Sequence, residues 1–135
     1  MHIAHTLTKA ERLSLQRELD LLFNREEPPE SFLAYPLRVV FVEQKPASGA
    51  SVAILASAPK KKFKHAVDRN RLKRLIRETC RLNKTALCNA MQAKDSGVLV
   101  GFLYVGDTIC TYDTMEAAMR KALNTLIHKT ICTND

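Results

Sequence analysis

The sequence predicts an α+β fold, a two-layer sandwich in which helices pack against one sheet. The periodicity of the apolar residues indicates the order helix, two or three strands, helix, strand, helix. Residues that favour turns separate these segments. The 135 residues, of which 46% are hydrophobic, suit a single buried core, so we treat residues 1–135 as one domain.

The first expected element is a helix over residues 7–24. Thr8 suits its N-cap, and Glu11 three residues later completes a capping-box pattern. Apolar side chains then recur at helical spacing, at Leu15, Leu19, Leu22 and Phe23. Pro28 and Pro29 cannot continue a helix, so we expect the segment NREEPPES to end it.

Two strands are expected next, over residues 35–43 and 51–58, with the turn KPASGA between them. Alternate side chains of the first strand face opposite sides of the sheet: Leu37, Val39 and Phe41 on one side, and Arg38, Val40 and Val42 on the other. A further strand spans Gly97 to Gly106. Its continuous apolar character predicts burial on both faces.

Two more helices are expected. One covers residues 66 to about 91, and the stretch TALCNAMQAKDS extends it. Its buried side should carry Leu72, Leu75, Ile76, Thr79, Asn83 and Leu87, with Cys80 at the margin. The last helix runs from about residue 114 to residue 129, with Asp113 or Thr114 as its cap. Its buried side should carry Met115, Ala118, Met119, Ala122, Leu123 and Leu126.

Positive charge is concentrated in the middle of the chain. The net charge is +7, yet residues 45–94 hold thirteen Lys/Arg and only two Asp/Glu. The far side of the long helix carries Asn70, Lys73, Arg74, Arg77, Arg81 and Lys84, with Arg69 and Arg71 on its flanks. The loop before it adds Lys60, Lys61, Lys62 and Lys64. Like charges four residues apart destabilise a helix by about 0.2–0.5 kcal/mol per pair, which an anionic partner would relieve.

The alternative is a charged helix face that is merely solvated. The nearly uniform sign of this face and the adjacent lysine loop favour nucleic-acid binding instead. A helix-turn-helix protein would have a short helix directly before the basic one, but here a strand and a loop precede it. This order favours recognition of RNA shape and backbone, and we expect no DNA partner.

The sequence shows no convincing catalytic constellation and predicts no metal site in the protein. There is no P-loop and no G-x-S-x-G motif, and the four cysteines form no CxxC pair. Asp68 and Glu78 stand isolated among cations, which argues against a protein-only nuclease. The apolar run from Val98 to Val105 is far shorter than the about 18 residues of a membrane span. With no secretory signal visible, we expect a cytoplasmic protein without a membrane partner.

The stretch KKKFKHAVDRNRLKRLIRETCRLNK, residues 60–84, closely resembles the signature of the bacterial ribonuclease P protein family. Its defining part is Arg69-Asn70-Arg71 followed by Leu72-Lys73-Arg74, and LTKAERL at residues 7–13 is similar to the opening of the family. The resemblance implies an accessory subunit of a ribonucleoprotein endonuclease that removes the 5′ leader from precursor tRNA. It also implies a left-handed β-α-β crossover in the fold.

The resemblance further implies which residues meet RNA. The partner would be a large catalytic RNA, which would hold the Mg²⁺ ions, so the protein itself would supply no catalytic group and no metal ligand. Contacts to this RNA are implied for Arg69, Asn70, Arg71, Lys73, Arg74 and Arg77, with Lys60, Lys61 and Lys62 beside them. Lys64 and Arg81 extend the same basic surface.

A separate cleft between the first helix and the sheet would hold the single-stranded leader, lined by Leu19, Phe23, Arg38 and Val40. The family usually carries two aromatic residues four apart on this helix, and this chain has Leu19 in place of the first. Core packing is the alternative role for Phe23. The alternative function for the whole chain is that of an RNA-binding protein without a part in cleavage, such as a small ribosomal protein.

Overall fold

The computed structural model describes residues 16–24, 26, 29–46 and 49–132 of the chain. Its elements in chain order are α1 (Gln16–Leu22), β1 (Glu30–Ala34), β2 (Leu37–Val42), β3 (Val52–Ser57), α2 (Ala66–Asn83), α3 (Thr85–Ala93), β4 (Val98–Tyr104) and α4 (Tyr112–Cys132). The predicted α+β class is confirmed. Thr8, Glu11 and Leu15 lie outside the described residues, so the beginning of the first helix stays a prediction.

The four strands form one sheet in the order β1-β2-β4-β3. β1 and β2 are antiparallel, as are β2 and β4, whereas β3 and β4 are parallel. The parallel pair is joined through α2 and α3, which gives the β-α-β connection that the resemblance implies. The hand of this connection stays a prediction.

β1 is a strand that the sequence pattern did not single out. Its five residues, ESFLA, include the last two of the segment NREEPPES, and they show no strong alternation. The strand forms because it pairs along its whole length with β2. Tyr35 and Pro36 make the turn between the two strands, so the strand expected from residue 35 begins at Leu37 instead.

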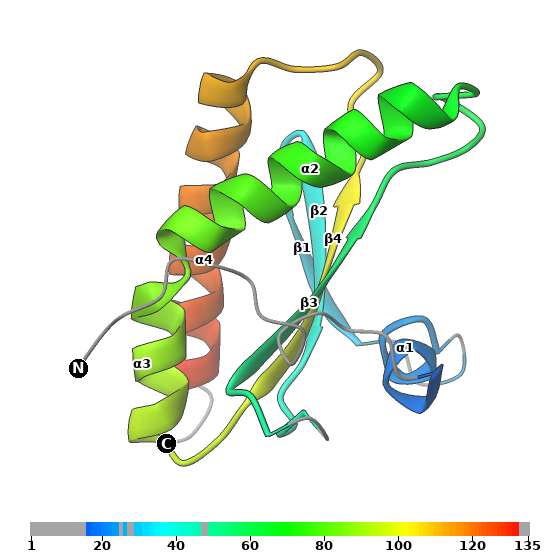
Figure 1. Cartoon of the computed structure of the whole chain (residues 1–135). Coiled ribbons are helices and arrows are strands. Elements are labelled where there is room, and N and C mark those ends of the chain that lie inside the picture. Colours follow the sequence, from blue (N-terminus) through cyan, green and yellow to red (C-terminus); the bar gives the residue numbers. More distant parts are fainter. Residues whose placement is uncertain (1–15, 25, 27–28, 47–48, 133–135) are drawn as a thin grey trace.

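The sheet separates two layers of helices (Figure 1). α2, α3 and α4 lie on one side and form the main core with the sheet, and α1 lies on the other. The predicted alternation of β2 is confirmed, because Leu37, Val39 and Phe41 belong to the main core while Val40 packs with α1. The predicted burial of β4 on both faces is confirmed as well.

α1 packs closely on its side of the sheet. Leu22 is buried against Val40 and Leu99. Between them lies Gly101, where a Cβ atom would approach Val40 Cγ2 to 2.9 Å and Leu22 Cδ1 to 3.7 Å. Gly101 therefore leaves room for the Val40 side chain, which packs with α1, and a Cβ atom at position 101 would meet Leu22 only at ordinary contact distance.

The single helix expected over residues 66–91 is wrong, since α2 ends at Asn83 and α3 begins at Thr85. Near the break, the Asn83 side-chain amide donates to the Thr79 carbonyl at 2.7 Å. Such side-chain bonds compete with the backbone ladder of a helix. The chain then changes direction, as Figure 1 shows, which lets α3 bury Leu87 and Met91 in the main core.

This change of direction also corrects the position of Lys84. The wheel for an unbroken helix put Lys84 on the cationic side, but its exposed fraction is only 7%. Lys84 sits at the junction of α2 and α3, so its side chain enters the interior and cannot belong to an exposed basic face.

α4 begins two residues earlier than expected, at Tyr112. The Thr111 hydroxyl accepts the backbone N–H of Thr114 at 3.2 Å, so Thr111 takes the capping role that was assigned to Asp113 or Thr114. The expected buried side is confirmed for Met115, Ala118, Met119, Ala122, Leu123 and Leu126. No helix in the described part of the chain is both long and apolar enough to cross a membrane.

Candidate nucleic-acid interface

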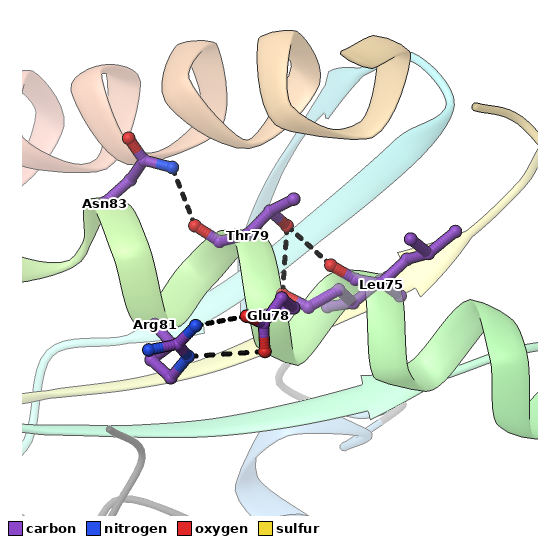
Figure 2. A network of polar contacts seen from close by, with 6 residues as sticks. Leu75, Glu78, Thr79, Arg81 and Asn83 are labelled. Atoms are coloured by element: carbon purple, nitrogen blue, oxygen red, sulfur yellow. Dashed lines mark hydrogen bonds and ion pairs between the residues drawn. The ribbon is translucent and has the colours of Figure 1, made fainter. Parts of the chain in front are cut away.

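α2 is oriented by the side chains that it buries. Leu72, Ile76 and Cys80 are buried in the main core, Cys80 more deeply than the marginal position expected for it. Thr79 is buried too, and its hydroxyl donates to the carbonyls of Leu75 and Ile76 at 2.8 and 3.1 Å (Figure 2). Because the Thr79 hydroxyl is hydrogen-bonded within its own helix, the buried side of α2 packs against the core without an unpaired donor at this residue. The opposite side of α2 faces solvent.

The predicted RNA-binding residues all lie on α2 or on the basic loop, which we define as residues 60–64. The exposed ones are Lys60, Lys61, Lys62, Lys64, Asn70, Arg71, Arg74 and Arg77. Arg69, Lys73 and Arg81 are half-buried. We call these residues together the basic surface.

The cations of the basic surface fall into two groups. Among the described residues, no hydrogen bond or ion pair engages the side chains of Lys60, Lys61, Lys64, Arg71, Lys73, Arg74 and Arg77. Their charged groups are thus available to an anion. Lys62, Arg69 and Arg81, by contrast, already have partners within the protein.

Arg81 is paired with Glu78 one turn earlier on α2. Nε donates to Oε2 at 3.3 Å, and Nη2 makes a second, shorter contact with Oε1 (Figure 2). The hydrogen bond from Arg81 lowers the pKa of Glu78, and the bond to Glu78 raises the pKa of Arg81. Glu78 therefore stays ionised and compensates the charge of Arg81, which weakens this end of the basic surface.

Arg69 folds back onto the basic loop. Its Nη1 donates to the carbonyls of Phe63 and Lys64 at 2.7 and 2.9 Å. The Arg69 side chain is thus hydrogen-bonded to the backbone of the basic loop. The Arg71 side chain makes no such bond within the described residues.

Phe63 anchors the basic loop in the core. It is buried, and its ring meets that of Tyr104 edge to face, with centroids 5.7 Å apart. The Tyr104 hydroxyl donates to the Thr108 carbonyl and accepts the Cys110 N–H at 3.1 Å. Burial raises the pKa of Tyr104 to about 12. Sequence reasoning missed this anchor, although a lone aromatic within a run of lysines was its signal.

The four residues expected to line a leader cleft share the side of the sheet that carries α1. Phe23 follows α1 directly and is 47% exposed, so the structure does not support core packing as its role. Arg38 is exposed, with Nη2 3.5 Å from the Ser31 hydroxyl. Leu19 is half-buried and packs against the cluster in which Val40 and Leu22 are buried. A cleft lined by these residues stays a prediction.

Arg38 has apolar neighbours that sequence reasoning missed. Across the strands it is paired with Leu33 of β1 and with Leu103 of β4. Leu33 is 56% exposed and Leu103 is half-buried. Leu33 escaped attention because β1 had not been recognised as a strand. Beyond α1, this side of the sheet therefore presents an accessible cation between two apolar side chains.

The described residues contain no group of three or more His, Cys, Asp and Glu that could hold a metal ion. The acidic residues of α2 are Asp68 and Glu78, and the second is bound to Arg81. The donor set on the basic surface thus consists of nitrogen cations, which suit phosphate oxygens rather than a divalent cation.

Comparison with known proteins adds an independent finding. The family model described as Ribonuclease P matches residues 7–127. Ribonuclease P protein components from two strains of Porphyromonas gingivalis are each 39% identical over 117 residues, which cover 87% of this chain and 83% of the relative. A ribonuclease P protein component from Chlorobaculum tepidum is 40% identical over 93 residues, or 64% of this chain and 58% of that protein.

Proposed function

This chain belongs to the ribonuclease P protein family, and from that premise we propose that its basic surface binds the catalytic RNA of ribonuclease P. The protein is an accessory subunit of an endoribonuclease complex that takes part in tRNA processing. The finer proposal is that it binds both the catalytic RNA and the precursor tRNA, in the cytoplasm, and assists removal of the 5′ leader.

The observation that carries the proposal is the set of uncompensated cations on α2 and the basic loop. Arg71, Arg74 and Arg77 are exposed and have no partner among the described residues. Each phosphate that such a group neutralises releases condensed counterions. For each such contact, the logarithm of the binding constant should fall by about 0.7–0.9 when the salt concentration rises tenfold. The planar guanidinium can also engage two phosphate oxygens at once, which favours arginine over lysine here.

The leader of the precursor tRNA is proposed to lie on the side of the sheet that carries α1. Phe23 is exposed and can stack on an unpaired base, an interaction worth about 1–3 kcal/mol. Arg38 can reach a phosphate from its place between Leu33 and Leu103. Leu19 and Val40 support this surface from below, because they pack α1 onto the sheet.

The protein's own contribution is binding and orientation. In the proposed complex, the RNA subunit would hold Mg²⁺, which would supply the Lewis-acid chemistry for hydrolysis of the phosphodiester bond, and a 5′ phosphate would remain on the tRNA. The residues of this chain hold the RNA backbone and the leader in register, with no proton transfer assigned to any side chain. Such positioning lowers the entropic part of the barrier.

Reconstitution tests the proposal. The full chain is combined with the ribonuclease P RNA of the same organism and a precursor tRNA at low Mg²⁺, and leader release is followed. We expect cleavage to need the protein and Arg74→Gln/Arg77→Gln to impair it. Arg120→Gln is the matched control, because Arg120 is exposed on α4 and paired with Glu116. If the protein binds the RNA but leaves cleavage unchanged, the alternative of an RNA-binding protein without a part in cleavage takes its place.

A further inference from the structure

We propose that Asp107 is a positioning residue, which acts through Lys62 to hold the basic loop in the shape that the RNA recognises. Lys62 is then a tether of the loop and not itself a ligand of the RNA. The proposal rests on the function proposed above and assigns different roles to the lysines of one loop.

The contacts of Lys62 lead to this inference. Its ammonium group lies 2.9 Å from Asp107 Oδ1 and 3.2 Å from the carbonyl oxygen of Val105. An ammonium group has three donors, and two of these are directed at the protein. Lys62 is also the least free of the four loop lysines, because the others have no partner among the described residues.

The acceptors of Lys62 are themselves held in place. The Val105 N–H donates to the carbonyl of Pro36 at 2.8 Å, in the turn between β1 and β2. Val105 thus connects the end of the sheet to the basic loop. At Gly106, a Cβ atom would come within 2.9 Å of the Tyr104 hydroxyl, so this glycine lets the chain turn close beside Tyr104 toward Asp107.

Three sets of contacts fix the basic loop. Lys62 is tied to Asp107, Phe63 is packed on Tyr104, and Arg69 binds the carbonyls of Phe63 and Lys64. The segment from Tyr104 to Asp107 supplies the partners in two of these three sets. A loop that is ordered before binding loses less conformational entropy when it meets its partner. Lys60, Lys61 and Lys64 remain exposed for that partner.

Two possible roles for Asp107 predict opposite changes in RNA affinity when its carboxylate is removed. If it is only an acidic group close to the basic surface, it repels RNA, and its removal should strengthen binding. If it positions the loop through Lys62, its removal should weaken binding although the protein becomes more positive. A ligand role for Lys62 can be separated in the same way, since loss of a phosphate contact lowers the salt dependence and loss of a tether does not.

The experiment measures binding of the full chain to the ribonuclease P RNA over a series of salt concentrations. The variants are Asp107→Asn, Lys62→Gln and the double variant, with Asp113→Asn as control. Asp113 is an exposed acidic residue in the first turn of α4, just after the connection that holds Asp107. It has no partner among the described residues, so Asp113→Asn changes the net charge equally but breaks no ion pair. Hydrogen exchange of the free protein is measured alongside, because the Phe63 N–H is bonded to the Pro59 carbonyl at 3.1 Å and reports on loop order.

We expect Asp107→Asn to weaken binding about two- to fivefold, the range of a surface ion pair worth up to about 1 kcal/mol, and to leave the salt slope unchanged. Lys62→Gln should match it, and the double variant should be no weaker than either. Exchange at Phe63 should quicken in all three variants and stay unchanged in Asp113→Asn.

Tighter binding by Asp107→Asn would make Asp107 only an acidic group that repels RNA, and it would overturn the proposal. A salt slope lowered by about 0.7–0.9 in Lys62→Gln would make Lys62 an RNA ligand and overturn it too. Unchanged exchange at Phe63 would overturn it as well, without any RNA present. Failure of the unaltered chain to bind this RNA would instead sink the function proposed above, and this inference with it.

Discussion

The guanidinium of Arg81 and the carboxylate of Glu78 form a two-contact ion pair on α2, in which Nε lies 3.3 Å from Oε2. The pair divides the helix surface. Arg71, Arg74 and Arg77 on its N-terminal side have no compensating partner among the described residues, whereas Arg81 does. Affinity for a polyanion should therefore depend mainly on the N-terminal and central turns of α2 and on the basic loop.

The first prediction concerns this pair. Glu78→Gln removes the carboxylate that compensates Arg81, so we expect binding to the ribonuclease P RNA to strengthen about two- to fivefold and its salt dependence to steepen. The matched control is Glu116→Gln, which frees Arg120 in the same manner on α4 and should leave affinity unchanged. Equal effects of the two substitutions would show that only net charge matters. Titration at several salt concentrations distinguishes these outcomes.

The second prediction separates the two arginines of the Arg69-Asn70-Arg71 triplet. Arg69→Lys keeps the charge but cannot reproduce both bonds to the loop carbonyls, so the free energy of unfolding should fall by about 1 kcal/mol. Arg71→Lys should leave it unchanged, because the Arg71 side chain is exposed. Urea denaturation measures both. Equal stability of the two variants would contradict a structural role for Arg69.

The third prediction tests the leader surface. Phe23→Ala should weaken binding of precursor tRNA by about 1–3 kcal/mol and leave binding of mature tRNA unchanged, because only the precursor offers unpaired leader bases. Stability should change little, since the ring is 47% exposed. Binding of both tRNAs to the reconstituted complex gives the comparison. If Phe23→Ala lowers stability but leaves the affinity for precursor tRNA unchanged, the ring serves packing and not leader binding.

The fourth prediction is a pH dependence of stability. Burial raises the pKa of Tyr104 from an ordinary value of 10.0 to about 12. The unfolded chain therefore loses this proton first, so the stability due to the neutral phenol is complete below about pH 10 and is lost as the pH rises toward 12. Urea denaturation at stepped alkaline pH should show this decline in the unaltered protein.

Tyr104→Phe is the variant for that measurement. It should be less stable at neutral pH by about 1–2 kcal/mol, because the Cys110 N–H and the Thr108 carbonyl lose their partner. Its stability should then decline less than that of the unaltered protein between about pH 10 and 12. Tyr112→Phe serves as control, since Tyr112 is exposed. Parallel alkaline declines in all three proteins would contradict the buried titration.

Several features of the molecule could be read from local patterns. The alternation of β2, the continuous apolar run of β4 and the buried side of α4 follow from periods of two and 3.6 residues, which depend only on backbone geometry. The basic surface follows from the order of residues in one stretch of 25, from Lys60 to Lys84, and the family resemblance follows from this stretch together with LTKAERL at residues 7–13. These properties need no knowledge of distant partners.

Other features depend on residues far apart in the chain. β1 is a strand because β2 lies beside it, and Lys84 is buried because α3 turns to reach the core. Lys62 and Asp107 are 45 positions apart, so no window of sequence could pair them. The periodicity of a helix shows which cations face solvent. Whether such a cation has a partner within the protein depends on whether the folded chain brings an acceptor within hydrogen-bond distance.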